Sequence, residues 1–193
     1  MNETIGLPKL KIAFEAAAQA VANRSKKGYV GMVVRDEKAQ GLHKLSSDTM
    51  IPLELGETNK AHIKTAFEGS DRGKPSLVYL AVIPPTTQGD TTTALEAGLK
   101  LLESVSVDYL AGPPDVTDGE LEVLDTWTKA QRAVYRPVKL VRPLTGEGSD
   151  DMGIIQLEET GLKVLGKAVT PASYCARMAG ILAGIPMSMS STY

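Results

Sequence analysis

Short apolar runs rich in β-branched residues alternate along this chain with segments whose apolar positions recur at helical spacing. Residues 28–34 and 76–83 are runs of the first kind, and they predict buried strands. Leu95, Leu99 and Leu102 lie three and four positions apart, which predicts an amphipathic helix. Shorter strands are expected at 107–111, 138–141, 153–157 and 162–165.

A polar, poorly periodic stretch runs to Leu55, and the residues after it predict a helix. Thr58 is expected to cap this helix, and Gly69 to end it. Its apolar face is expected to consist of Ile63, Ala66 and Phe67.

Two more helices are predicted by their N-terminal residues. Thr117 and Glu120 fit a capping box, in which each side chain satisfies the other residue's exposed amide. Thr170 followed by Pro171 is a second helix start, and that helix is rich in alanine and glycine up to Gly184. The first of the two is expected to bury Leu121, Leu124, Trp127, Ala130 and Val134.

The order strand, helix, strand, helix, strand between 76 and 141 is the βαβ pattern. Such a pattern predicts parallel strands joined by right-handed crossovers, with helices packed on the sheet. We therefore expect an α/β fold with a mixed, mainly parallel sheet flanked by helices.

The segment before residue 28 has a different character. Leu10, Ile12 and Phe14 alternate with polar residues, which predicts an extended strand, while 16–22 is alanine-rich and favours a helix by propensity. A segment with so little apolar content suits strand addition to a neighbour's sheet, but it also suits a first strand of the chain's own sheet. We expect 1–27 to form an extended arm and 28–193 the α/β domain.

Composition and charge narrow the function classes. The 193 residues carry a net charge of -2, which gives no electrostatic reason to expect nucleic acid. The single cysteine, Cys175, is expected to be a small buried residue. The N-terminus lacks the features of a signal peptide, and no apolar run approaches the roughly 20 residues of a membrane span. The chain is expected to fold in a cytoplasm.

Motifs for chemistry are weak. Residues 69–76 resemble a phosphate-binding loop, but one residue is missing between the glycines and Pro75 has no amide for a phosphate, so we expect a turn. His43 and His62 lack metal-ligand spacing and are expected to be exposed or hydrogen-bonded. The acidic stretch 146–151 is expected to be a solvated loop. No catalytic residue, cofactor or metal site is predicted.

Several segments resemble the sheath proteins of contractile tails, in particular those of Gram-positive phages, defective prophages and phage-tail-like bacteriocins. The resemblance is carried near the N-terminus by 6–14, 20–25 and 28–36, and near the C-terminus by 176–186 and 190–193. It covers nearly the whole chain but only about the first half of a family member. The C-terminal sheath domain of the family is therefore expected to be absent from this chain.

The resemblance implies a structural subunit and not an enzyme. Such subunits form hexameric rings that stack helically around a tail tube, and contraction drives the tube through a target cell envelope. Implied partners are further copies of the subunit, the tube protein, and the baseplate and tail terminator proteins, without nucleic acid, membrane insertion or cofactor. The implied location is a virion or phage-tail-like particle assembled in a bacterial cytoplasm. The resemblance also assigns Leu10, Ile12 and Phe14 to a strand between subunits.

Two other function classes stay open. A protein-binding adaptor domain could use the small-residue helix at 170–184 as its binding face. An α/β enzyme could assemble a site from Asp108, Asp115 and Asp118, which lie near the end of a predicted strand. Asp115, Asp118 and Glu120 lie near a predicted helix N-terminus, so a favourable interaction with the helix dipole also explains them.

Overall fold

A computed structural model describes residues 28–85, 91–145, 148–159, 161–164 and 166–186. Within these residues the strands and helices follow in the order β1 (Tyr29–Arg35), β2 (Gly41–Leu45), the short 3₁₀ helix η1 (Asp48–Met50), α2 (Glu57–Glu68), β3 (Leu77–Ile83), α3 (Thr91–Leu102), β4 (Tyr109–Ala111), α4 (Asp118–Ala133), β5 (Lys139–Pro143), β6 (Ile154–Leu157), β7 (Lys163–Val164), β8 (Lys167–Ala168) and α5 (Pro171–Gly184).

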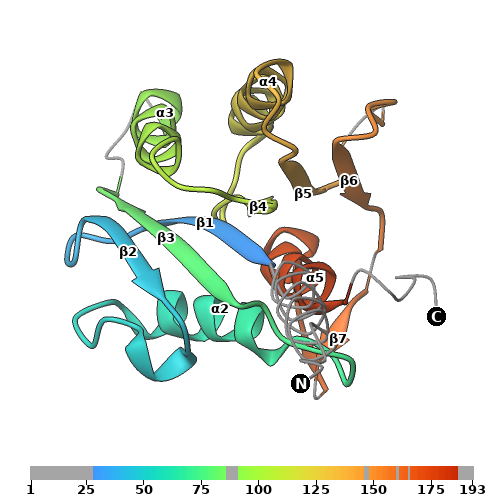
Figure 1. Ribbon diagram of the computed structural model, residues 1–193. Coiled ribbons are helices and arrows are strands. Elements are labelled where there is room, and N and C mark those ends of the chain that lie inside the picture. The colour runs from blue at the N-terminus through green and yellow to red at the C-terminus, as the bar shows by residue number, and fades with distance from the viewer. Residues whose placement is uncertain (1–27, 86–90, 146–147, 160, 165, 187–193) are drawn as a thin grey trace, which may run out of the picture.

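The strands of the main sheet lie in the order β2-β3-β1-β4-β5-β6 (Figure 1). β1 pairs in parallel with β3 and β4, and β5 pairs in parallel with β4 and β6. Only β2 runs antiparallel, against β3. The mixed, mainly parallel sheet predicted from the βαβ pattern is therefore confirmed. A separate two-stranded antiparallel pair, β7 and β8, precedes α5.

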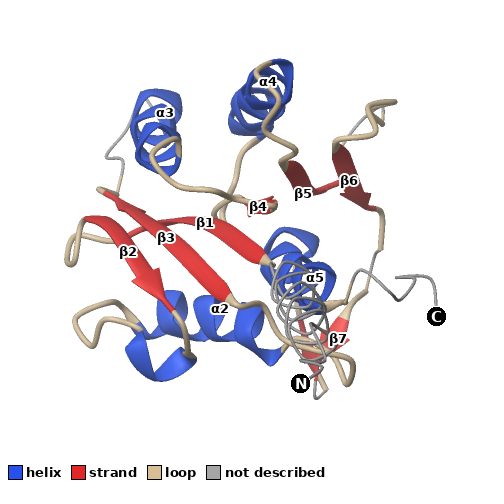
Figure 2. Cartoon of the chain, viewed as in Figure 1, coloured by secondary structure: helices blue, strands red, loops and turns tan. Residues whose placement is uncertain are grey.

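The sheet lies between two helical layers (Figure 2). α3 and α4 cover one face, and α2 and α5 cover the other. Because strands of a sheet buried on both faces need apolar residues at successive positions, β1 reads as a nearly continuous apolar run from Val30 to Val34. Alternate residues of that run enter different clusters: Met32 faces α2 and α5, and Val33 faces α3 and α4.

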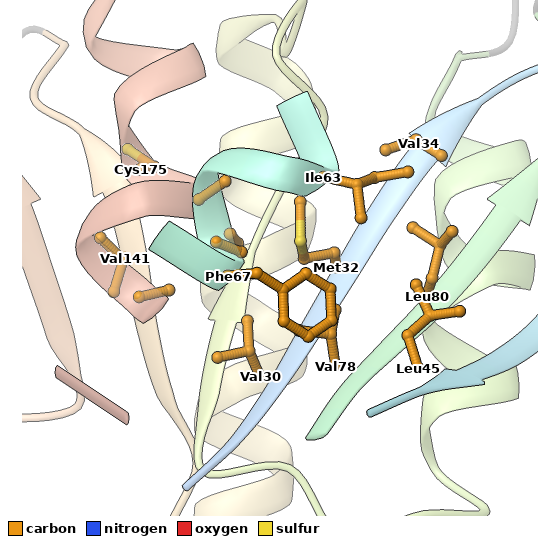
Figure 3. Close-up of a cluster of buried hydrophobic side chains, with 14 of the residues drawn as sticks. Val30, Met32, Val34, Leu45, Ile63, Phe67, Val78, Leu80, Val141 and Cys175 are labelled. Atoms are coloured by element: carbon orange, nitrogen blue, oxygen red, sulfur yellow. The ribbon is translucent and has the colours of Figure 1, made fainter. Parts of the chain in front are cut away.

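The cluster beneath α2 combines large side chains of the sheet with small side chains of α5. Figure 3 shows Phe67 and Ile63 of α2 over Val30, Met32 and Val78 of the sheet. The α5 helix contributes Cys175, Ala176, Ala179 and Ala183 to the same cluster. Cys175 is 2% exposed, which confirms its prediction as a small buried residue, and burial raises the pKa of its thiol to about 12.

Two sequence predictions for the first half of the domain are revised, and a third is confirmed. Residues 41–45, expected to be irregular, form the edge strand β2, which pairs through backbone groups and needs little from its own side chains. α2 begins one residue before Thr58, with Gly56 and not Thr58 as its N-cap. Its predicted buried face and its end at Gly69 are confirmed. The loop resembling a phosphate-binding motif is a turn, in which Ser70 and Gly73 exchange backbone hydrogen bonds.

The predicted face of α4 is only half right. The capping box of Thr117 and Glu120 is present, and Leu121 and Leu124 are buried. Further along the helix Thr128 and Gln131 are buried, while Ala130 and Val134 are exposed and Trp127 is half-buried. The strand at 9–14, the alanine-rich segment 16–22 and the proposed arm 1–27 lie outside the described residues. None of the described helices has both the length and the apolar character that crossing a membrane requires.

Candidate functional site

The carboxyl ends of parallel strands are where α/β folds usually place a ligand, and several charged side chains lie at this edge of the sheet. At the end of β1, Arg35 donates hydrogen bonds to Glu120 of α4 and, over 2.5 Å, to Asp115 of the loop before α4. The Glu120 side chain is completely buried, whereas the side chain of Asp115 is 65% exposed. Burial of a carboxylate requires such a partner, because an unpaired buried charge is strongly destabilising.

Both oxygens of the Glu120 carboxylate are occupied. Oε1 accepts from Arg35, and Oε2 accepts from the backbone amide of Thr117 at 2.8 Å and from its hydroxyl at 3.0 Å. The carboxylate thus closes the capping box of α4 and joins α4 to β1. These contacts give the carboxylate a structural role and leave neither oxygen free for a substrate. The capping-box pattern predicts Glu120 as part of a helix cap, but nothing in that local pattern indicates Arg35 as its partner.

A second carboxylate at the same edge has a comparable role. Asp36 accepts hydrogen bonds from the backbone amide of Gly56 at 2.8 Å and from the Asn59 amide at 2.9 Å. The Gly56 bond is the main cause of a lowered pKa for Asp36, supported by a bond from the backbone amide of Lys38. Asp36 therefore holds the N-terminus of α2 against the end of β1.

His62 of α2 contradicts its prediction as an exposed or hydrogen-bonded residue. It is 5% exposed, and within the described part of the chain neither ring nitrogen has a hydrogen-bond partner. Burial lowers the pKa of His62 to about 4, against weaker opposing effects of Asp115 and the backbone of Ser173. The ring is thus neutral at neutral pH and lies enclosed between helices.

The three aspartates of the enzyme hypothesis do not come together. Asp108 precedes β4 at the amino end of the sheet, where it accepts from the backbone amide of Tyr29 at 2.9 Å. Asp115 and Asp118 follow the opposite end of β4, and both are exposed. The strand is predicted to begin at Val107, but β4 begins at Tyr109. Asp108 therefore lies before the strand and not near its carboxyl end. No cluster of three or more metal-ligating side chains occurs among the described residues.

The small-residue helix of the adaptor hypothesis is used inside the domain. A Cβ added at Gly180 of α5 would collide with the backbone carbonyl of Ala66 in α2, so the two backbones are in direct contact. Gly28 makes the same kind of approach to Ala183. An ion pair between Arg177 and Glu68 further joins α5 to α2. The glycine and alanine face of α5 is therefore not available to a partner.

A groove lies between α3 and α4 on the described surface. Its volume is about 760 Å³, and its lining includes Leu99, Val123 and the half-buried Trp127. The Trp127 indole donates to the carboxylate of Glu103 over 3.2 Å. Carboxylates and apolar carbon together line this groove.

The class defined by these observations is a three-layer α/β domain whose conspicuous polar residues support the fold. No protein-family model matches the chain. Over 188 residues it is 30% identical to the tail sheath protein of Clostridium phage phiCD119, and the match covers 97% of this chain and 51% of that protein. The chain thus spans about half the length of the curated relative it matches.

Two solved structures have a similar fold. The crystal structure of the sheath tail protein from Desulfitobacterium hafniense matches with a TM-score of 0.65 and 14% identity, over 86% of this chain and 61% of that one. The helical sheath of the anti-feeding prophage in its contracted state matches with a TM-score of 0.51 and 15% identity, over 81% of this chain and 46% of that one. The chain is thus similar in sequence to a phage tail sheath protein, and it shares its fold with two sheath proteins of known structure.

Proposed function

We propose that this chain is a structural subunit of a contractile tail sheath, which polymerises around a tail tube and contracts to drive the tube through a target cell envelope. The observation that carries the proposal is its similarity to a phage tail sheath protein along 97% of its length. The Desulfitobacterium and anti-feeding prophage structures, both of sheath proteins, support it at the level of the fold.

The described polar residues support a role without catalysis. Glu120 and Asp36 join helix ends to the sheet, and Asp108 holds the backbone of Tyr29. Each of these carboxylates already accepts hydrogen bonds that stabilise the domain, so none is left to act on a substrate. We infer that the subunit is not an enzyme, and that the work of contraction comes from free energy stored on assembly.

The partners follow from the same proposal. Further copies of the subunit form hexameric rings stacked as a helix, with the tube protein inside and the baseplate and tail terminator proteins at the ends. The particle is a virion or a phage-tail-like particle, assembled in the cytoplasm of a bacterial host. Leu10, Ile12 and Phe14 form the apolar face of a strand that each subunit adds to a neighbour.

Deletion of residues 1–24 from the intact protein tests the role of this arm. The expected result is loss of sedimentable assemblies, with the circular dichroism and melting temperature of the α/β domain retained. A finer pair of variants is Ile12→Asp, which places a charge on the apolar face of the strand, and Ala13→Asp, which places it on the other face. Assembly should fail only for Ile12→Asp. Undiminished assembly of the deletion variant would remove the arm from the proposal.

A further inference from the structure

Residues 133–137, the α4 corner, form an exposed turn at the C-terminal end of α4. Every residue of the α4 corner is exposed, and the side chain of Tyr135 is 96% exposed. We infer that the α4 corner of one copy of this chain docks in the groove between α3 and α4 of a second copy. This inference rests on the proposed function, in which copies assemble, and adds a pair of surfaces through which they meet.

The backbone of the α4 corner holds Tyr135 in a conformation that favours glycine. Its φ is 63°, in the left-handed region. The Tyr135 amide donates to the Arg132 carbonyl over 3.0 Å. The Arg136 amide donates to the Gln131 carbonyl, also over 3.0 Å, which completes the hydrogen-bond pattern of a Schellman cap. Glycine usually occupies the left-handed position of such a cap, but here a large aromatic side chain projects into solvent. Backbone strain of this kind gathers at functional positions, and tyrosine is enriched at the centre of protein contacts.

The groove between α3 and α4 has an apolar lining with acidic side chains around it. The two helices lie side by side on one face of the sheet (Figure 1). The groove has a volume of about 760 Å³, and its apolar lining includes Leu99, Val123 and Trp127. Its charged lining consists of exposed side chains, three of them carboxylates and one an ammonium: Glu96, Glu103, Glu122 and Lys100. An apolar side chain flanked by positive charges would therefore fit this groove.

The α4 corner supplies that combination. The exposed side chains of Val134 and Tyr135 lie next to Arg136, and the exposed Lys139 follows. Residues 126–144 contain no acidic side chain. The other described large apolar side chains that are more than half exposed lie close in sequence to carboxylates: Met50 and Leu53 near Asp48 and Glu54, and Met152 after Asp150 and Asp151. Like charges would keep those segments out of an acidic groove, so charge complementarity selects the α4 corner.

The α4 corner and the groove are different surfaces of the same chain. Because Tyr135 is 96% exposed, it leaves the groove of its own chain open. One copy can therefore place its corner on one neighbour and receive the corner of another, so that the contact repeats from copy to copy. A contact of this kind suits a subunit that polymerises.

Trp127 fluorescence tests whether a second copy covers the groove, because the chain has a single tryptophan. In single chains, acrylamide should quench its emission. In assemblies, Trp127 should be protected from acrylamide and should emit at shorter wavelength. Protection already present in single chains, or equal quenching in single and assembled chains, would overturn the inference and leave the proposed function standing. If the unaltered protein never assembles, the proposed function fails together with the inference.

Tyr135→Gly separates a role in contact from a role in folding. Glycine adopts the left-handed conformation without strain, so the melting temperature should stay equal or rise. The dissociation constant for assembly, measured by sedimentation, should rise at least about tenfold because the central side chain of the contact is lost. Leu53→Ala is the matched control, since that side chain is 88% exposed outside the contact, and it should assemble like the unaltered protein. Equal assembly of the two variants would contradict the contact.

Thr126→Arg tests the groove side of the contact. Thr126 is exposed and lines the groove, so an arginine there occupies the groove and brings a positive charge toward the α4 corner. Ala97→Arg is the control, because it places the same side chain at an exposed position of α3 that is not part of the groove lining. We expect only Thr126→Arg to raise the dissociation constant by at least about tenfold. Equal effects of the two arginines would overturn the assignment of the groove.

A mixture of the two contact variants tests whether corner and groove bind each other. Chains with Tyr135→Gly keep an intact groove, and chains with Thr126→Arg keep an intact α4 corner. When the two variants carry different tags, pairs that contain both tags should form more readily than pairs of either variant with itself. A mixture that associates no better than either variant alone would contradict the inference.

Discussion

The two helical layers of this domain are packed by opposite means. On the α2–α5 side, the backbone of α5 makes close contacts at its glycines. Gly180 contacts Ala66 of α2, and Gly184 contacts Gly73 of the turn before β3. On the α3–α4 side, leucine side chains such as Leu99 and Leu124 fill the space over the sheet, and a groove of about 760 Å³ stays open between the helices. Backbone contacts at glycines hold α5 against α2, whereas large side chains hold α3 and α4 on the sheet.

This difference separates the surfaces by availability. The small residues of α5 suggest a binding face when the sequence is considered alone, but they pack against other elements of the domain. Under the proposed function, contacts with other copies would then use surfaces other than the glycine and alanine face of α5. The comparison also predicts opposite sensitivities: the α2–α5 layer should not tolerate larger residues, and the α3–α4 layer should not tolerate smaller ones.

The largest effect is expected for Gly180→Val. Its side chain cannot fit against the Ala66 carbonyl, so α5 must move away from α2, which also disturbs the ion pair of Arg177 with Glu68. We expect a loss of about 4 kcal/mol or more in the free energy of unfolding, measured by urea denaturation. Gly119→Ala is the control, since a Cβ there meets nothing within 4 Å; it should shift stability by less than about 1 kcal/mol. Equal effects would break the comparison.

Truncation of a buried side chain should destabilise the α3–α4 layer. Leu124 of α4 is fully buried, and Leu124→Ala is expected to cost about 3 kcal/mol in the same measurement because it leaves a cavity over the sheet. Leu101→Ala changes the same side chain where it is 37% exposed, and should cost less than about 1 kcal/mol. A Leu124→Ala variant as stable as Leu101→Ala would show that the α3–α4 layer is not held by side-chain volume.

The free energy of unfolding should depend on pH through His62 of the α2–α5 layer. His62 on α2 is buried without a hydrogen-bond partner among the described residues, and its pKa of about 4 lies below the ordinary value of 6.5. Between these values the unfolded chain binds a proton that the folded chain excludes. Stability should therefore fall as the pH drops from 6.5 to 4, by up to about 1.4 kcal/mol per pH unit. His62→Leu should flatten this slope; an unchanged slope would assign it to other groups.

Much of the fold could be predicted from local patterns. The strands at 28–34 and 76–83 and the helices beginning after Thr117 and Thr170 each carry an apolar run or a cap, and these signals act within a few residues. The parallel sheet follows from their order along the chain, because βαβ units have one favoured arrangement.

The errors arose where distant contacts decide. β2 pairs through its backbone with β3, so its weak side-chain pattern gave no signal. α2 starts at Glu57 because Asp36, twenty residues earlier, accepts from the Gly56 amide. The sequence pattern predicts Glu120 as a cap, but the burial of its carboxylate depends on Arg35 of β1. The prediction that His62 is exposed or hydrogen-bonded is wrong because a local pattern cannot show that α2 will be enclosed.

The central claim is that the protein works by assembling with copies of itself. Negative-stain electron microscopy of the intact protein at high concentration, without added nucleotide, tests this most directly. The account predicts tubes or stacked rings of uniform diameter. Particles that stay single at every concentration would contradict it.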